Sequence, residues 1–306
     1  MKVIIGTRGS KLALWQTNRV RTLLKKQFPD VLFEIKIIKT TGDIDQKTPL
    51  SQIGGIGLFT KQLEKALANK EIDVAVHSFK DMPSIIEERF EIAAVLERER
   101  VNDVFISKKY RFEDLKAKPL IVGTGSLRRV SQLKLTFPHI QTKSLRGNID
   151  TRIKKLEDGL YDGIILAYAG IKRLGMEEKV TDIIPVDVLT PAVAQGAIAV
   201  EVRRGDEIIK NLVSTINHKE TMLCVNEERD FLRVVEGGCR IPVGAYARFE
   251  KGSFVIDAFI GSIDGKNVLR HKVELPKDGF EDAGKNLGRY LLENGGRNIL
   301  KEMEKR

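Results

Sequence analysis

Cysteine, histidine and aromatic residues are scarce in this sequence of 306 residues, which has two cysteines, four histidines and an aromatic content of 6%. The cysteines, Cys224 and Cys239, cannot form a disulfide framework or a zinc site, and the histidines are scattered without metal-binding spacing. No apolar run approaches the roughly 20 residues that span a bilayer, and the run at 3–5 is too short for a signal peptide. These absences predict a cytoplasmic protein without a metal centre or a membrane span.

Basic residues are in surplus, because 52 Lys and Arg against 42 Asp and Glu give a formal net charge of +10. A hydrophobic content of 42% and a charged content of 31% are typical of a soluble globular protein, and the length allows two or three domains. The surplus favours an anionic partner. Composition leaves nucleic acid, a membrane surface and small polyanionic metabolites open.

Cys239 lies in the segment Gly237-Gly238-Cys239-Arg240, where chemistry can reach a thiol. The glycines allow unusual backbone conformations, and the neighbouring Arg240 favours the reactive thiolate over the thiol. An isolated cysteine is more often buried and inert, so the segment alone leaves both interpretations open.

Two parts of the sequence share one pattern of strand, glycine-containing loop and helix. The first part covers 3–28, and the second repeats the order over about 120–137. Each part is followed by another apolar strand, at 72–76 and at 161–166, that ends in polar and basic residues. Strands that alternate with helices predict two α/β lobes with parallel sheets.

Polar and basic residues gather where the predicted strands end, and ligands bind at the carboxyl ends of strands in such sheets. Helix N-termini there favour anions, and the arginine fork donates two parallel hydrogen bonds to a carboxylate or phosphate. One arginine alone is more often a surface residue, but the same placement in both lobes predicts an anion-binding site. The candidate residues are Arg8, Ser10, Ser78, Lys80, Ser126, Arg128, Arg129, Arg146, Arg152 and Arg173.

Nucleotide-binding motifs do not account for these residues. Gly123-Thr124-Gly125 begins like a dinucleotide fingerprint, but Arg128 takes the place of the third glycine and no acidic residue follows at the expected distance. No Gly-x-x-x-x-Gly-Lys-Ser/Thr loop is present either. Nucleotide use is not indicated.

The pattern changes after about residue 219. A helix is predicted over 222–235, followed by antiparallel strands at 243–249, 254–263 and 268–275 with Asp264-Gly265 as a hairpin turn. Helical spacing over 280–304 closes the chain. These elements predict a small α+β domain, with Cys239 in the loop between its first helix and first strand.

Short segments over essentially the whole chain carry a specific family resemblance. They are Thr7-Arg8-Gly9-Ser10-Lys11-Leu12-Ala13-Leu14-Trp15-Gln16, His77-Ser78-Phe79-Lys80-Asp81-Met82-Pro83, Gly123-Thr124-Gly125-Ser126-Leu127-Arg128-Arg129, Leu145-Arg146-Gly147-Asn148, Pro191-Ala192-Val193-Ala194-Gln195-Gly196, Glu228-Arg229-Asp230-Phe231 and Gly237-Gly238-Cys239-Arg240-Ile241-Pro242. With these segments the sequence resembles the porphobilinogen deaminase family, also called hydroxymethylbilane synthases.

The resemblance implies a fold of the α/β class, with two similar periplasmic-binding-protein-like lobes around a cleft and a small α+β C-terminal domain. The first lobe would comprise residues 1–97 with 197–215, the second 101–191, and the cysteine-bearing domain 219–306. The apolar run at 197–202 would return the chain to the first lobe, so that two crossovers join the lobes and allow hinge motion. The resemblance also implies a monomer.

The implied activity is that of a transferase of tetrapyrrole and heme biosynthesis. Such an enzyme condenses four porphobilinogen molecules head to tail, with loss of ammonia, on a covalently bound dipyrromethane primer and releases hydroxymethylbilane by hydrolysis. Each pyrrole carries an acetate and a propionate, so primer and full chain present roughly a dozen carboxylates to the arginines.

By the same resemblance, Cys239 would carry the dipyrromethane cofactor through a thioether bond, and Asp81 would be the catalytic aspartate. A carboxylate beside the pyrrole nitrogens would stabilise positive charge and help to move protons, whereas sequence alone allows a capping or turn role for Asp81 equally well. The ten residues named above, with Gln195, would bind cofactor or substrate. Phe59 would stack on a pyrrole ring, and its alternative role is a core residue at a helix start.

The sequence also departs from the family pattern. Ile56 stands where lysine is common, Gln62 replaces a frequent glutamate, and Tyr168 stands where a small residue is common. These departures leave the loop and substrate contacts open. The long polar stretch at 42–57 predicts a mobile lid.

Two other classes of protein remain as alternatives. Two α/β lobes around an anion cleft also describe non-enzymatic solute-binding proteins. A nucleic-acid binder would place basic residues along one helix face with interleaved aromatics, whereas the candidate arginines here lie in predicted loops. We therefore expect a small-molecule substrate, no nucleic acid and no membrane.

Overall fold

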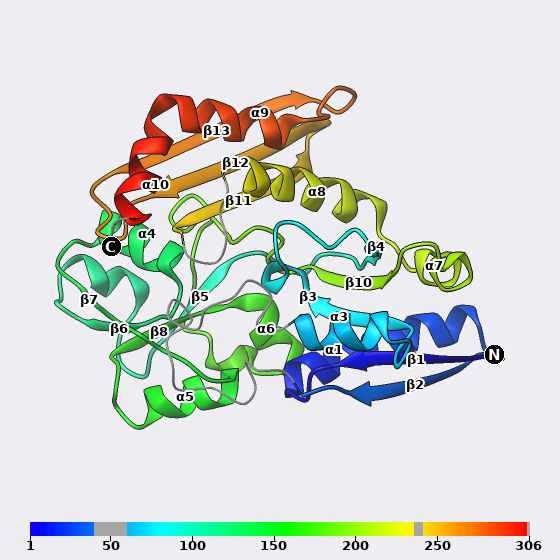
Figure 1. Cartoon of the computed structure of the whole chain (residues 1–306). Helices are drawn as coiled ribbons and strands as arrows, with labels where there is room; N and C mark the ends of the chain where they lie inside the picture. The colour runs from blue at the N-terminus through cyan, green and yellow to red at the C-terminus, as the bar shows by residue number, and fades with distance from the viewer. Residues whose placement is uncertain (40–59, 236–240, 305–306) are drawn as a thin grey trace. The chain divides into compact units, whose positions relative to one another are not determined.

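The structure is a computed structural model that describes residues 1–39, 60–235 and 241–304. The chain forms two compact units, Met1–Glu99 with Gly196–Leu223 and Arg100–Gln195 with Cys224–Arg306 (Figure 1). The predicted lid at 42–57, Phe59 and Cys239 lie outside the described residues. The three domain ranges expected from the sequence stay a prediction.

The first lobe is built on a five-stranded sheet. Its strands are, in order, β2 (Leu32–Ile37), β1 (Lys2–Thr7), β3 (Val74–Ser78), β10 (Ile198–Arg203) and β4 (Phe90–Val95). β1 is parallel to β2 and β3, whereas β10 is antiparallel to β3 and β4. The return of the chain to the first lobe is confirmed, but the expectation of a purely parallel sheet is wrong.

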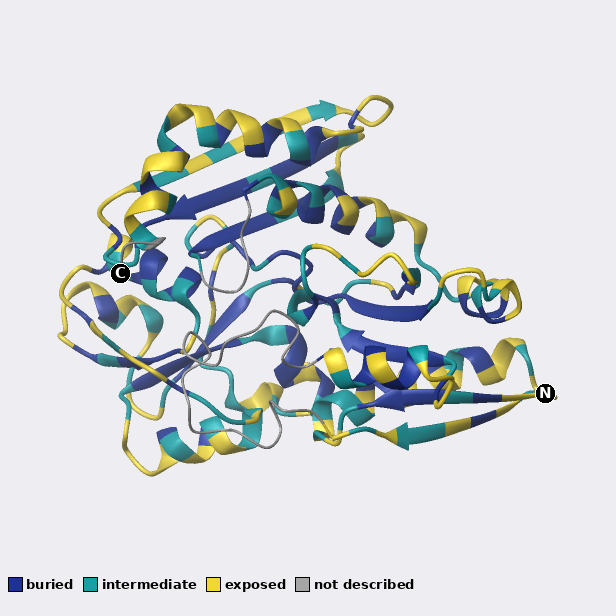
Figure 2. Ribbon diagram, viewed as in Figure 1, coloured by how far each residue is buried: buried dark blue, intermediate teal, exposed yellow. Residues whose placement is uncertain are grey.

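The first lobe buries its apolar strand residues beneath helices. α1 (Lys11–Gln27) contributes Val20 and Leu24 to the same core as Val3 and Ile5 of β1, and α7 (Glu207–Ser214) adds Leu212. α3 (Lys61–Ala68) packs Leu63 and Leu67 into a second cluster. Figure 2 shows β3 and β10 almost entirely buried. The carboxyl end of β3, at Ser78, lies beside the amino end of β10, at Ile198, because the two strands are antiparallel.

The second lobe repeats the strand order of the first. Its sheet runs β7 (Gln141–Lys143), β6 (Ile121–Gly123), β8 (Gly163–Ala167), β5 (Asp103–Ile106) and β9 (Asp182–Ile183). β6 is parallel to β7 and β8, and β5 is antiparallel to β8 and β9. In each lobe, three neighbouring strands are parallel and the strand beside them is antiparallel. That antiparallel strand, β10 in the first lobe and β5 in the second, is the first strand that the chain forms after it crosses from the other lobe. The likeness of the lobes, which the sequence predicted, is confirmed in this topology.

Helices follow the parallel strands of the second lobe. They are α4 (Leu127–Thr136), α5 (Ile149–Glu157) and α6 (Tyr168–Arg173), and short 3₁₀ turns cover Phe112–Lys116 and Glu177–Lys179. Leu133 of α4 packs into one buried cluster, and Ile153 of α5 packs into another.

The C-terminal segment has a sheet of its own. α8 (Lys219–Val234) precedes the antiparallel strands β11 (Val243–Glu250), β12 (Ser253–Gly261) and β13 (Val268–Pro276), and α9 (Ala283–Leu291) packs on β12 and β13. The helical spacing over 280–304 is found as two helices. A turn at Leu292–Gly296 separates α9 from α10 (Arg297–Glu304), because Gly295 has a φ of 111° that ends α9.

These elements confirm the predicted fold class of two similar α/β lobes and a small α+β C-terminal domain. Among the helices of the described residues, none combines the length and the apolar character needed to cross a membrane.

α9 packs so closely on α8 that only glycine fits at the second position of α9, which is Gly284. A Cβ on Gly284 would overlap the backbone carbonyl of Glu227, and Glu227 Oε2 accepts the Gly284 N–H at 2.8 Å. Burial raises the pKa of Glu227, although this hydrogen bond acts against the increase. The close contact holds α8, the helix that leads to the cysteine loop in the sequence, against the C-terminal sheet domain.

Gly284→Ala should therefore lower the free energy of unfolding by about 2 kcal/mol or more, because a methyl group there must push two helix backbones apart. Urea unfolding followed by circular dichroism measures this. Arg289→Ala, on the exposed side of α9, is the control and should change the value by less than about 0.5 kcal/mol. Equal effects of the two substitutions would contradict the close packing.

Candidate active site

The first lobe brings the start of α1 to the end of β3. Arg8 and Ser10 follow β1, and the Ser10 hydroxyl caps α1 by accepting the Ala13 N–H at 3.2 Å. One turn later, the Gln16 amide and the Ser78 hydroxyl exchange hydrogen bonds of 2.8 and 3.2 Å. The polar residues of two separate motifs thus meet at one edge of the sheet.

Asp81 ends a short 3₁₀ turn, Phe79–Asp81, that begins directly after β3. The turn is anchored by the buried ring of Phe79 and by its N–H, which donates to the Ala197 carbonyl at 3.1 Å. Asp81 is half-buried, and no hydrogen bond or ion pair of its carboxylate is found in the described part of the chain. The alternative capping role of Asp81 therefore has no partner among the described residues.

In the second lobe, two strand-to-helix loops lie side by side. Gly125 packs on the next loop so closely that a Cβ would stand 2.9 Å from the Leu145 carbonyl, and Thr124 N–H donates to the Lys143 carbonyl at 2.9 Å. Ser126 stands at the N-cap of α4, but its hydroxyl makes no capping hydrogen bond. The start of α4 therefore lies beside the segment that carries Arg146.

The loop before α5 has a fixed shape. Gly147 has a φ of 109°, Arg152 Nε donates to its carbonyl at 2.6 Å, and Lys155 donates to the Arg146 carbonyl at 3.1 Å. Arg146 Nη1 is buried and has no hydrogen-bond partner among the residues described. This loop holds its backbone in place and leaves one arginine donor unused.

Arg128 and Arg129 lie at the start of α4 and are almost fully buried. Both pair with Asp103, the first residue of β5: Arg128 Nη2 lies 2.8 Å from Oδ2, and Arg129 Nη2 lies 2.7 Å from Oδ1. Burial alone would raise the pKa of the Asp103 carboxyl, but the two arginine charges and their hydrogen bonds lower it well below its usual range. The two arginines therefore favour the ionised form of this carboxylate.

Gln195 joins the same carboxylate from a different segment. Its amide donates to Asp103 Oδ1 at 2.8 Å and to the Val101 carbonyl at 2.6 Å. The preceding residue, Ala194, has a φ of 59°, an unfavourable value for a non-glycine residue. Its N–H donates to Glu228 Oε2 at 2.7 Å, so the buried Glu228 of α8 holds the turn that presents Gln195.

Most of the described candidates follow the end of a strand, but Gln195 precedes β10. The expectation that the candidate arginines lie in loops is wrong for four of them, since α4 carries Arg128 and Arg129, α5 carries Arg152 and α6 carries Arg173. Arg173, the last residue of α6, is buried with an exposed fraction of 8%. Gln62 follows the first residue of α3, and Tyr168 opens α6 with its ring beneath the Arg100 guanidinium. The roles of all these residues stay predictions.

Sequence reasoning missed two residues that organise the site, Asp103 and Gln16. Gln16 belongs to a motif but received no role. Asp103 had one signal, which is an acidic residue directly before the apolar run Val104-Phe105-Ile106. A carboxylate at the start of a buried strand needs a partner, and the sequence offers no way to choose which arginines supply it.

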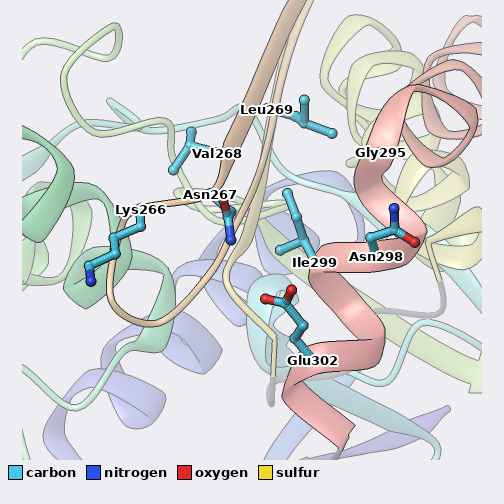
Figure 3. Close-up of a pocket in the computed structure, with 8 residues that line it drawn as sticks. All are labelled: Lys266, Asn267, Val268, Leu269, Gly295, Asn298, Ile299 and Glu302. Atoms are coloured by element: carbon cyan, nitrogen blue, oxygen red, sulfur yellow. The ribbon is translucent and has the colours of Figure 1, made fainter.

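A surface hollow of about 370 Å³ lies away from these residues, on the C-terminal domain. Figure 3 shows Ile299 and Glu302 of α10 on one side and Lys266 and Asn267, before β13, on the other. None of the predicted site residues lines it, so the hollow does not locate the candidate site.

Comparisons with known proteins agree with this arrangement. The family model "Porphobilinogen deaminase, dipyromethane cofactor binding domain" matches residues 3–211, and "Porphobilinogen deaminase, C-terminal domain" matches residues 222–293. A porphobilinogen deaminase from Syntrophomonas wolfei subsp. wolfei is 48% identical over 98% of this chain and 98% of its own length. That of Chlorobium phaeovibrioides is 44% identical over 99% and 98%.

Among solved structures, a TRAP periplasmic solute binding protein from Desulfovibrio salexigens DSM2638 is 11% identical, with a TM-score of 0.44, and the match covers 73% of this chain and 74% of that chain. Fold and site define an α/β protein with two lobes of one topology, each with polar or basic side chains at its strand ends, and a small α+β domain. The family models and the relatives are more specific: the chain belongs to the porphobilinogen deaminase family. The family and the enzyme class indicated by the sequence motifs are confirmed.

The structure predicts a structural role for Glu228, whose Oε1 also accepts the Ala247 N–H at 2.8 Å. In Glu228→Gln, one carboxylate oxygen is replaced by an NH₂ group, which cannot accept a hydrogen bond. One of the two backbone N–H groups, that of Ala194 or that of Ala247, then loses its acceptor. The free energy of unfolding should therefore fall by about 1–3 kcal/mol. Chemical denaturation measures the loss. Glu220→Gln, at the exposed start of α8, is the control, and an equally small effect in both variants would contradict the role.

Proposed function

We propose that this protein is a hydroxymethylbilane synthase that joins four porphobilinogen molecules head to tail with loss of ammonia and releases the linear product by hydrolysis. The proposal rests on family membership and on two buried arginine nitrogens of the second lobe that have no hydrogen-bond partner among the described residues. Its place in metabolism is tetrapyrrole and heme biosynthesis.

The unused donors are the observation that carries the proposal. Arg128 Nε and Arg146 Nη1 are buried nitrogens without a hydrogen-bond partner in the residues that the structure describes. An unpaired buried donor costs free energy, so each favours a ligand with acceptor oxygens. The acetate and propionate groups of pyrroles supply such oxygens, and charge-assisted hydrogen bonds to arginine are the strong kind.

A dipyrromethane cofactor on Cys239 fits this donor set, because each of its pyrroles carries two carboxylates. When bound, it supplies the primer to which the first porphobilinogen unit is added. Ser126, Arg128, Arg129, Arg146, Arg152, Arg173 and Gln195 of the second lobe, with Arg8, Ser10, Ser78 and Lys80 of the first, would bind its carboxylates or those of the substrate, and Phe59 would stack on a pyrrole.

Asp81 would act on the reacting pyrrole. Loss of ammonia from porphobilinogen gives an electrophilic azafulvene with positive charge on the ring, and a carboxylate beside the ring nitrogen stabilises that charge. The same carboxylate can accept and return the pyrrole proton as the carbon-carbon bond forms. Its lack of a protein partner in the described residues leaves both functions open to it. We place the enzyme in the cytoplasm as a monomer.

Intact-mass measurement tests the covalent cofactor. Wild-type protein from heme-competent cells should exceed its sequence mass by one dipyrromethane, and Cys239→Ser should lack the addition. Cys224→Ser is the matched control, because Cys224 is a buried free cysteine on α8, and this variant should keep the full addition. A wild-type protein at its bare sequence mass would argue for a non-enzymatic binding protein.

Asp81→Asn tests the chemistry. The variant should keep the cofactor mass but lose about 10²- to 10⁴-fold in kcat for ammonia release, which is the range expected for a group that moves a proton and stabilises charge. Glu87→Gln is the control, since Glu87 is an exposed carboxylate in the same segment and pairs with nearby Arg89. Ammonia release by Asp81→Asn near the wild-type rate would refute the assignment.

A further inference from the structure

Three predicted ligand-binding residues converge on one carboxylate, that of Asp103. Arg129 donates to it twice, from Nε to Oδ2 at 3.0 Å and from Nη2 to Oδ1 at 2.7 Å. Arg128 and Gln195 each donate once, both at 2.8 Å. With an exposed fraction of 0%, Asp103 itself is out of reach of any ligand.

One further donor of each arginine is held by a backbone carbonyl. Arg128 Nη1 donates to Thr190 at 2.6 Å, and Arg129 Nη1 donates to Ile165 at 2.9 Å. Thr190 is itself fixed by Gln132, whose amide accepts the Thr190 N–H at 2.8 Å and donates to the Thr190 carbonyl at 3.2 Å. Both guanidinium planes are therefore fixed in position and in rotation.

The cluster has one positive charge more than it has negative charge. Two guanidinium groups face one carboxylate, and Arg128 Nε has no partner in the described residues. Burial and the neighbouring Arg129 charge both favour the neutral form of Arg128, and Asp103 counteracts them, although the pKa of Arg128 remains lowered. The Asp103 carboxylate thus holds the two buried guanidinium groups close together and neutralises one of their two positive charges.

We propose that Asp103 is a positioning residue, which orients Arg128, Arg129 and Gln195 so that the pre-formed cluster receives a ligand carboxylate. This inference rests on the proposed function, because the ligand is a carboxylate of the pyrrole cofactor or substrate. Asp103 is fully buried, so it acts on the ligand through these three side chains and does not touch the ligand itself.

A purely structural ion pair is the alternative. Buried ion pairs are often neutral for stability when replaced as a whole, so their presence alone says little about function. A structural role predicts that loss of Asp103 lowers stability and the amount of active protein, while cofactor loading and KM of the folded protein stay constant. A positioning role predicts that loading and KM change.

Asp103→Asn keeps the side-chain shape and removes the charge. Among folded molecules, the cofactor-loaded fraction in intact-mass spectra should fall to about a tenth or less of the wild-type value, since a missing partner of a buried charge pair typically costs a tenfold loss in binding or more. The loaded remainder should show a KM for porphobilinogen raised by about tenfold or more, with a smaller change in kcat. The shape of its pH profile should match that of the wild type.

Arg129→Lys separates geometry from charge. Lysine retains the charge but cannot make the two-point contact with both Asp103 oxygens, so loading and KM should change in the same direction as in Asp103→Asn. Asp257→Asn is the control, because Asp257 pairs with Arg248 Nη1 at 2.6 Å within the C-terminal sheet, and this variant should load and turn over like the wild type. If Asp103→Asn does not fold, Arg129→Lys decides by the same readouts.

Full loading and unchanged KM in Asp103→Asn, or in Arg129→Lys where the first variant does not fold, would overturn the positioning role while leaving the proposed function intact. A wild-type protein without cofactor mass would instead refute the proposed function. The two failures are therefore distinguishable in one set of spectra.

Discussion

The ion cluster of Asp103 with Arg128 and Arg129 is the interaction on which the candidate site of the second lobe depends. Burying three charges is unfavourable unless each is paired and hydrogen-bonded, and here almost every donor and acceptor has a partner at 2.6–3.0 Å. The exception, Arg128 Nε, is the kind of donor that a ligand carboxylate would satisfy. The positions of both buried guanidinium groups thus depend on one carboxylate.

The two lobes share a strand order but offer different chemistry at their strand ends. In the first lobe, β3 leads to a partly exposed carboxylate, Asp81, with Ser78 held by Gln16. In the second lobe, the corresponding β8 leads to α6 and Arg173, and β6 leads to Ser126 and the buried arginines. The same topology therefore carries a partly exposed carboxylate after β3 of the first lobe and buried arginines after β6 of the second.

The small C-terminal sheet packs against the arginine cluster through a glycine of β11 and an arginine of β13. Gly244 of β11 leaves no room for a side chain, because a Cβ would lie 2.6 Å from the Pro191 carbonyl and 3.2 Å from Arg128 Cδ. Arg270 of β13 donates to Gln132 Oε1 at 2.9 Å, and Gln132 holds Thr190, which accepts from Arg128. The strand that follows the cysteine loop in sequence is therefore packed directly against the residues expected to bind the cofactor.

The sequence by itself determined the family, the repeated lobes, the C-terminal domain and the candidate residues, because strand periodicity, glycine loops and motif residues are local signals. It did not determine that each lobe has a mixed sheet, since β5 and β10 acquire their direction only when the chain crosses between lobes. Nor did it determine the break at Gly295 or the partner of Asp103. Those features depend on contacts between residues far apart in the chain, such as Asp103 with Gln195, and only tertiary packing decides which buried charges meet.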